Sequence, residues 1–178
     1  MKKFCKILDD KTGLVQLGAG CSDEYYISIG MTLKDVEQSE IDFQWYLTNK
    51  CPHYTEQEKF EMAKADKYAE ALGGAKQFIE TEACYQFNKS NSIEATDGNI
   101  GKFTAYALGF VSGAYESVQW TSKEDNVLTL NQEQVQTILF GLGAIQSNVW
   151  NVQFVAYKNL IEQAETIEDI NAIEVHYD

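Results

Sequence analysis

Cys51 and His53 are the two residues of this chain whose types and spacing come closest to a chemical site. They flank Pro52, the only proline among the 178 residues. A cysteine acts as a nucleophile when it is ionised, so it needs a base within hydrogen-bonding reach and surroundings that lower the pKa of its thiol. His53 or the later His176 could be that base, but no motif for an oxyanion-binding donor lies nearby.

The same pair could belong to a metal site. Zinc sites use cysteine, histidine and carboxylate ligands, usually three or four from the protein, so Cys51 and His53 would need further ligands. Cys5 and Cys21 lie in the same part of the chain and are the candidates. The cysteines are widely spaced, no Cys-x-x-Cys occurs, and reduced thiols are the expectation for a cytosolic protein. We therefore predict no catalytic, cofactor-binding or metal-binding residues and no cofactor.

Two acidic clusters also offer ligand chemistry, but neither has the spacing of a calcium loop. Glu56, Glu58 and Glu61 fit the first turns of a helix, whose positive end favours carboxylates. Glu124 and Asp125 fit a solvated turn.

Tyrosine and tryptophan side chains suit surfaces that contact other proteins, because they combine a large apolar area with a polar group. Two groups of aromatic residues are therefore predicted as a protein interface, one in the first third of the chain and one late in a long helix. The predicted interface residues are Tyr25, Tyr26, Trp45, Tyr46, Trp150, Phe154 and Tyr157.

The composition excludes several partners. The formal net charge is −13 and every basic residue is a lysine, so a nucleic acid would be repelled and would find no guanidinium group to bind. No apolar run is long enough to span a membrane. The N-terminus has lysines but no apolar segment of a signal peptide, so we expect synthesis and folding in a reducing cytoplasm.

The pattern of secondary-structure elements expected from the sequence predicts an α+β protein. A small β-rich head at 1–54 is followed by a mainly helical domain at 55–178. In the head, runs at 3–8 and 14–17 predict a hairpin, Ser22 caps a helical turn over 23–29, and 41–47 reads as a strand. Thr55 to Glu58 form a capping box.

In the second domain we predict helices over about 56–83, 97–114 and 131–165, and a hairpin over about 116–130. The first helix would bend or break at Gly73-Gly74, the segment 85–96 reads as a loop or short extended segment, and a short helix over 167–172 precedes a frayed tail. Thr96 or Asp97, and Asn131, are the capping residues of the second and third helices.

The helix over Asn131–Glu165 organises this domain. Its apolar residues recur every three or four positions, a spacing that keeps one seam against a partner. They are Val135, Ile138, Leu142, Ile145, Val149, Val152, Ala156 and Leu160. A row of small residues at Gly101, Ala105, Gly109 and Gly113 would let the first half of this helix pack closely inside its own domain. The turns from about Trp150 would remain for the head or another subunit.

Several motifs resemble a helical domain of unknown function in small proteins of tailed bacteriophages, many of them linked to tail fibres or to fibre assembly. The features that match this domain begin near Tyr68, while Trp45-Tyr46-Leu47 before Cys51-Pro52 resembles leader segments of similar short phage proteins. The others are Tyr85-Gln86-Phe87, Asp97-x-Asn99-Ile100, Ser117-Val118-Gln119-Trp120, Asn126, Val127-Leu128-Thr129-Leu130 and Ile161-x-x-Ala164-x-Thr166-x-x-Asp169-Ile170. That family has no established catalytic residues, so none are transferred. Its members often carry an arginine in the first helix, which this chain lacks.

The resemblance implies a non-enzymatic structural protein of the tail or tail-fibre region. It would be made in the host cytoplasm, reside in the virion and act through contacts with other tail proteins and copies of itself, without nucleic acid or membrane insertion. One alternative is a tail-fibre assembly chaperone that is absent from the mature particle. Another is a small thiol or metal-dependent enzyme centred on Cys51 and His53.

Overall fold

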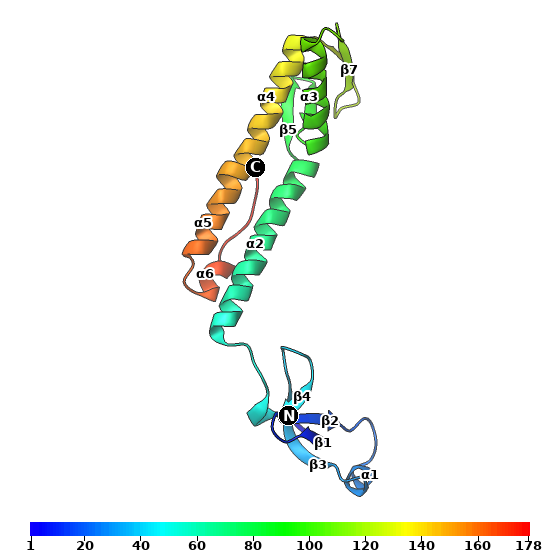
Figure 1. Cartoon of the computed structure of the whole chain (residues 1–178), viewed down its shortest axis with the longest axis vertical. Coiled ribbons are helices and arrows are strands. Elements are labelled where there is room, and N and C mark those ends of the chain that lie inside the picture. Colours follow the sequence, from blue (N-terminus) through cyan, green and yellow to red (C-terminus); the bar gives the residue numbers. More distant parts are fainter. The chain divides into compact units, whose positions relative to one another are not determined.

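The computed structural model describes all 178 residues and divides into two compact units, Met1–Lys59 and Phe60–Asp178. We call them unit 1 and unit 2 (Figure 1). The fold class is α+β, as predicted: strands dominate the first unit and helices the second. Unit 1 corresponds to the predicted head at 1–54, extended by the start of the first long helix.

Unit 1 is a small closed barrel of four antiparallel strands in the order β1-β2-β4-β3. Its elements are β1 (Lys2–Asp9), β2 (Leu14–Leu17), α1 (Asp23–Ser28), β3 (Thr32–Gln38), β4 (Trp45–Leu47) and the 3₁₀ turn η1 (Thr48–Lys50). The first hairpin and the helical turn capped by Ser22 are confirmed. The barrel core consists of Cys5, Val15 and Val36, with larger side chains packed around them. So small a core leaves little margin of stability.

Two predictions for this unit were wrong. The sequence analysis missed β3, whose residues are mostly exposed and therefore lack the alternating apolar pattern of a half-buried strand. It also predicted a strand over 41–47, but only Trp45–Leu47 pairs. Phe43 has a φ of 59° and its side chain is 74% exposed, because residues 39–44 form a turn closed by hydrogen bonds between Ser39 and Gln44 and between Ser39 and Phe43.

The remaining elements form unit 2, except that the first turn of α2 belongs to unit 1. They are α2 (Glu56–Thr81), β5 (Cys84–Asn88), β6 (Asn91–Glu94), α3 (Asp97–Val111), β7 (Val118–Thr121), β8 (Val127–Leu130), α4 (Gln132–Asn148), η2 (Val149–Phe154), α5 (Val155–Gln163) and α6 (Ile167–Asn171). The predicted helices, the hairpin at β7–β8 and the short final helix are all present. The caps at Thr96, Asn131 and Thr166 form their expected hydrogen bonds.

The segment predicted as a loop or short extended segment, 85–96, is extended, and most of it forms a second hairpin, β5–β6, which the prediction lacked. Its polar composition hid the pairing, because part of its support comes from side-chain contacts with the β7–β8 turn. Glu124 accepts hydrogen bonds from the backbone nitrogen and the hydroxyl of Ser92. The side chain of Asn91 accepts from Ser122 and Asn126. Glu124 is thus a structural link rather than a purely solvated turn residue.

α3 and α4 pack together, so the first half of the long helix lies inside its own domain as predicted. The prediction that the row of small residues on α3 forms the contact with the long helix was wrong. Its large residues, Phe103 and Phe110, meet α4 in the core. The row of small residues does not: a Cβ at Gly101 would meet nothing within 4 Å, and Gly113 has a φ of 74° just beyond the helix end.

The long helix is continuous from α4 to α5, but it contains a π-helical segment, η2, that shifts the buried face by one residue. Val149 is fully buried, as predicted. Beyond it, the predicted seam residues Val152, Ala156 and Leu160 are exposed. The residues that face inward are instead Phe154, two positions after Val152, and Tyr157 and Ile161, each one position after a predicted seam residue. Extra residues inserted as a π-bulge produce this kind of shift.

α2 runs through Gly73-Gly74 to Thr81, so of the two predicted alternatives the break at this pair is excluded. It lies alongside η2 and α5, with Tyr68 against Phe154 and Ala75 in one cluster with Val149 (Figure 1). The tail predicted to fray is instead folded against α2. Tyr177 is buried, its hydroxyl donates to the Ala71 carbonyl at 2.7 Å, and its ring would lie 3.1 Å from a Cβ at Gly74.

None of the helices combines the length and apolar character needed to cross a membrane.

The shift of the buried face at η2 predicts that a charge costs much more folding free energy at Val149 than at Val152. Val149→Asp places a charge in a fully buried position and should cost about 3–5 kcal/mol of folding free energy. Val152→Asp, at a position 60% exposed, should change it by less than about 0.5 kcal/mol. Urea unfolding of the full chain measures both values. Equal costs would contradict the shift of face at η2.

The link between the two hairpins predicts a pH dependence. Hydrogen bonds from Ser92 lower the pKa of Glu124 from 4.5 to about 2. The stabilisation is therefore complete above about pH 4.5 and is lost as the pH falls towards 2. Wild type should lose more thermal stability than Glu124→Gln across this window, and Ser92→Ala should reduce the difference. Parallel melting curves of wild type and Glu124→Gln against pH would refute this assignment.

Candidate functional site

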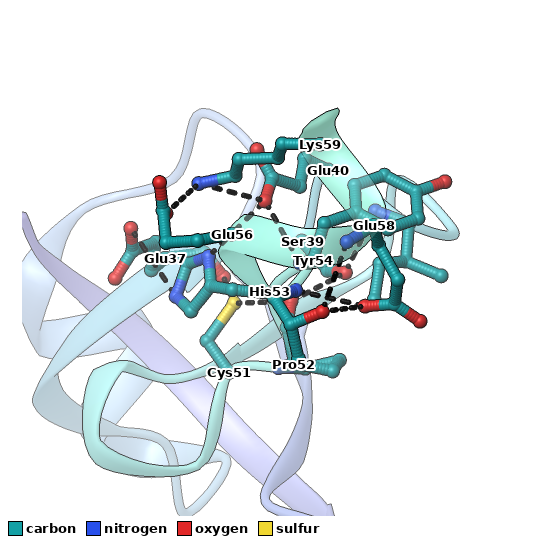
Figure 2. Close-up of polar contacts among 12 residues, drawn as sticks. Glu37, Ser39, Glu40, Cys51, Pro52, His53, Tyr54, Glu56, Glu58 and Lys59 are labelled. Atoms are coloured by element: carbon teal, nitrogen blue, oxygen red, sulfur yellow. Dashed lines mark hydrogen bonds and ion pairs between the residues drawn. The ribbon is translucent and has the colours of Figure 1, made fainter. Parts of the chain in front are cut away.

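The residues singled out for their chemistry lie where the chain leaves the barrel. Cys51 follows η1, and Pro52 and His53 lead towards α2 (Figure 2). Buried Ser39 fixes this exit, because its hydroxyl donates to the Pro52 carbonyl at 3.1 Å and accepts from the Ile41 amide. The start of α2 is fixed by the predicted capping box. The Thr55 amide donates to the Glu58 carboxylate, and the Glu58 amide donates to the Thr55 hydroxyl.

Glu37, near the end of β3, completes a group with Cys51 and His53. One ligand atom from each of the three side chains lies within 4.8 Å of the other two. The Nε2 atom of His53 is 3.8 Å from the Glu37 carboxylate, and its Nδ1 atom is 3.9 Å from the carboxylate of Glu40. Figure 2 shows the imidazole ring and the Cys51 sulfur together beside β3. The sequence analysis had found Cys51 and His53 but neither glutamate.

The other residues considered for this chemistry lie elsewhere. Cys5, suggested as a further ligand, is buried in the barrel core, and Cys21 is exposed beside α1. Neither belongs to the group of Glu37, Cys51 and His53. His176 is part of unit 2, where its amide donates to the Tyr157 hydroxyl. The Cys84 sulfur accepts a hydrogen bond from the Lys123 ammonium group, with 3.2 Å between Nζ and Sγ.

The surroundings of Cys51 disfavour a free nucleophile. Partial burial raises the pKa of its thiol above the ordinary value, and the carboxylates of Glu37, Asp42 and Glu40 raise it further. A thiol of raised pKa stays protonated near neutral pH and reacts slowly.

The predicted interface residues divide by burial. Tyr25 is 52% exposed, and Trp45 is half-buried with Lys3 over its ring. Tyr26 and Tyr46 are buried within unit 1, where Tyr26 accepts from the Cys21 amide and Tyr46 donates to Asp42. These two have little surface to offer a partner, so we drop them from the predicted interface.

The three late aromatic residues, Trp150, Phe154 and Tyr157, are half-buried and belong to the cluster that packs η2 and α5 against α2 and the tail. Tyr157 meets Tyr177 edge-on, and Trp150 meets Phe154 in the same way. Much of their surface is therefore used inside unit 2, and only their outer edges remain for a partner.

The chain matches no protein-family model, no curated protein and no solved structure.

The division between Tyr25 and Tyr26 is testable. Tyr26 stacks on Phe4 with ring centroids 5.4 Å apart, so Tyr26→Ser should destabilise unit 1 by about 3 kcal/mol. Tyr26→Phe, which removes only the acceptor of the Cys21 amide, should cost about 1 kcal/mol. Hydrogen–deuterium exchange of the β1 and β3 amides reports on this unit alone. Tyr25→Ser serves as the control: its half-exposed ring meets Tyr26 only edge-on, at 6.2 Å between centroids, so it should speed that exchange much less than Tyr26→Ser does. Equal effects of the two variants would contradict the division.

Proposed function

We propose that this chain is a non-enzymatic structural protein of a bacteriophage tail or tail fibre and acts through contacts with other tail subunits, including copies of itself. The assignment to tailed phages rests on the motif resemblance described above. What the structure contributes is a surface suited to protein contacts and a chemical site poorly suited to thiol catalysis.

The observation that carries the proposal is the exposure of large apolar side chains on α3 and α4. Phe140 is 76% exposed, Val111 72% and Leu108 65%. They stand on two neighbouring helices whose other faces already share a core. Single exposed apolar residues are common on any protein, but several on adjacent elements are typical of interaction surfaces.

Further exposed apolar side chains lie at and beyond the π segment. Because η2 turns the inward face, the apolar residues Val152 and Leu160 of the original seam point to solvent, 60% and 51% exposed. The turn of the face packs Phe154, Tyr157 and Ile161 inside unit 2 but leaves Val152 and Leu160 about half in water. Fully burying an apolar side chain is worth about 1.5–3 kcal/mol, so part of that free energy is still available at each of the two. A partner that covered these residues would recover it.

The charge supports the same proposal. A net charge of −13 keeps such a protein soluble before assembly, because molecules of like charge repel one another at a distance. It also implies that self-association depends on salt. At 0.1 M salt, the repulsion between charges more than about 10 Å apart is largely screened.

The proposal predicts that the full chain associates in solution and that Phe140 contributes to the contact. Phe140→Asp should weaken self-association about tenfold or more, because it removes apolar burial and adds a charge. Its melting temperature measured at low concentration should stay near that of wild type, since Phe140 makes little contact with the core. Analytical ultracentrifugation at several concentrations and salt levels measures the association.

A matched control is Gln132→Asp, at an exposed polar position of the same helix. It should affect association less than Phe140→Asp. A wild-type chain that stays monomeric at all accessible concentrations, at both low and high salt, would contradict self-association.

A further inference from the structure

The group of Glu37, Cys51 and His53 has the composition of a transition-metal site. A thiol, an imidazole and a carboxylate come from three separate positions of unit 1: the end of β3, the residue after η1 and the residue after Pro52. These ligand types together favour zinc, since magnesium and calcium select oxygen ligands alone. Neither the resemblance nor the proposed function assigns a metal to them.

The spacing is close to what a zinc ion requires. With bonds of about 2.0–2.3 Å, neighbouring ligand atoms of a tetrahedral site lie about 3.3–3.8 Å apart. The three atoms here lie within 4.8 Å, and the Glu37 oxygen is 3.8 Å from the His53 Nε2 atom. The side chains of His53 and Glu37 are 46% and 43% exposed, so both can rotate by the small amount needed.

His53 also has the second partner that metal-bound histidines usually have. Its Nδ1 atom faces the Glu40 carboxylate at 3.9 Å, on the opposite side of the ring from Glu37. Glu40 is held there by the Tyr54 amide, which donates to it at 3.0 Å (Figure 2). A carboxylate on the far nitrogen fixes the orientation of the ring and makes the near nitrogen a better ligand.

The local charge favours a cation. The carboxylates of Glu37 and Glu40 lie 3.8 Å and 3.9 Å from the two ring nitrogens of His53. Lys59 lies 3.9 Å from Glu40 and 3.3 Å from Glu56, which leaves the Glu37 carboxylate without a lysine partner among the ion pairs of unit 1.

We propose that unit 1 binds one Zn²⁺ ion through the Cys51 sulfur, an imidazole nitrogen of His53 and a carboxylate oxygen of Glu37, with the fourth position open to water. The ion joins the end of β3 to the segment by which the chain leaves the barrel. In a unit with so small a core, this bond adds folding free energy that the apolar residues do not supply.

The test uses the full chain, reduced and freed of metal, and titrates it with Co²⁺ as a spectroscopic substitute for Zn²⁺. A thiolate-to-cobalt charge-transfer band should appear and saturate at one ion per chain, and Zn²⁺ should remove it. Cys51→Ser should abolish the band. His53→Gln and Glu37→Gln should each weaken Zn²⁺ binding, and Glu40→Gln should weaken it less than either.

Cys21→Ser is the control, because it removes an exposed cysteine of the same unit and should leave the titration unchanged. If a variant fails to fold, the wild type still decides: saturating Zn²⁺ should slow alkylation of Cys51 at least tenfold and leave Cys21 as reactive as before, as read by peptide mass spectrometry. No charge-transfer band, or alkylation of Cys51 unaffected by Zn²⁺, would overturn the proposal. Either result would leave the proposed tail function standing.

Discussion

Unit 2 depends on keeping one apolar face of a long helix buried over its whole length. α4 achieves this with Val135, Ile138 and Leu142 against α3 and the two hairpins. Beyond Val149 the neighbours change to α2 and the tail, so the buried face must turn. The π segment η2 supplies that turn. It directs large aromatic side chains inward and leaves the aliphatic residues of the regular repeat in solvent, where a partner could cover them. The same π segment thus completes the packing of unit 2 and exposes residues of the proposed contact surface.

Features encoded by a few neighbouring residues were predictable from the sequence. The caps at Ser22, Thr96, Asn131 and Thr166 each consist of one side chain and an amide three residues away, so the sequence alone identified them. Features that depend on distant residues were missed. The β5–β6 hairpin is held by Glu124, more than 30 residues later, and Tyr177 is ordered by α2. The heptad-like spacing carried no sign of η2, because a π segment keeps the composition of a helix and changes only its phase.

The candidate site likewise contains residues that the sequence revealed and residues that only the fold brings together. Cys51 and His53 stood out because they are rare residue types close together, but the sequence analysis sought their partners among the cysteines. Glu37 could not be found, because it reaches them only through the pairing of β3 with β4, and β3 itself was not predicted. The prediction of no metal rested on the wide spacing of the cysteines and the absence of a Cys-x-x-Cys motif. The proposed zinc site and the proposed tail function are compatible, since a metal that reinforces a small barrel would suit a protein that must stay folded in a particle.

The central claim is that this chain belongs to the assembled tail. If the proposal holds, a tailed phage encodes the chain, and quantitative mass spectrometry of purified particles of that phage, compared with the lysate of infected cells, tests the claim most directly. The account predicts peptides from both units in the particles, at a fixed ratio to the known tail proteins and retained through repeated purification. A protein abundant in the lysate and absent from purified particles would contradict the claim and would favour a transient assembly chaperone.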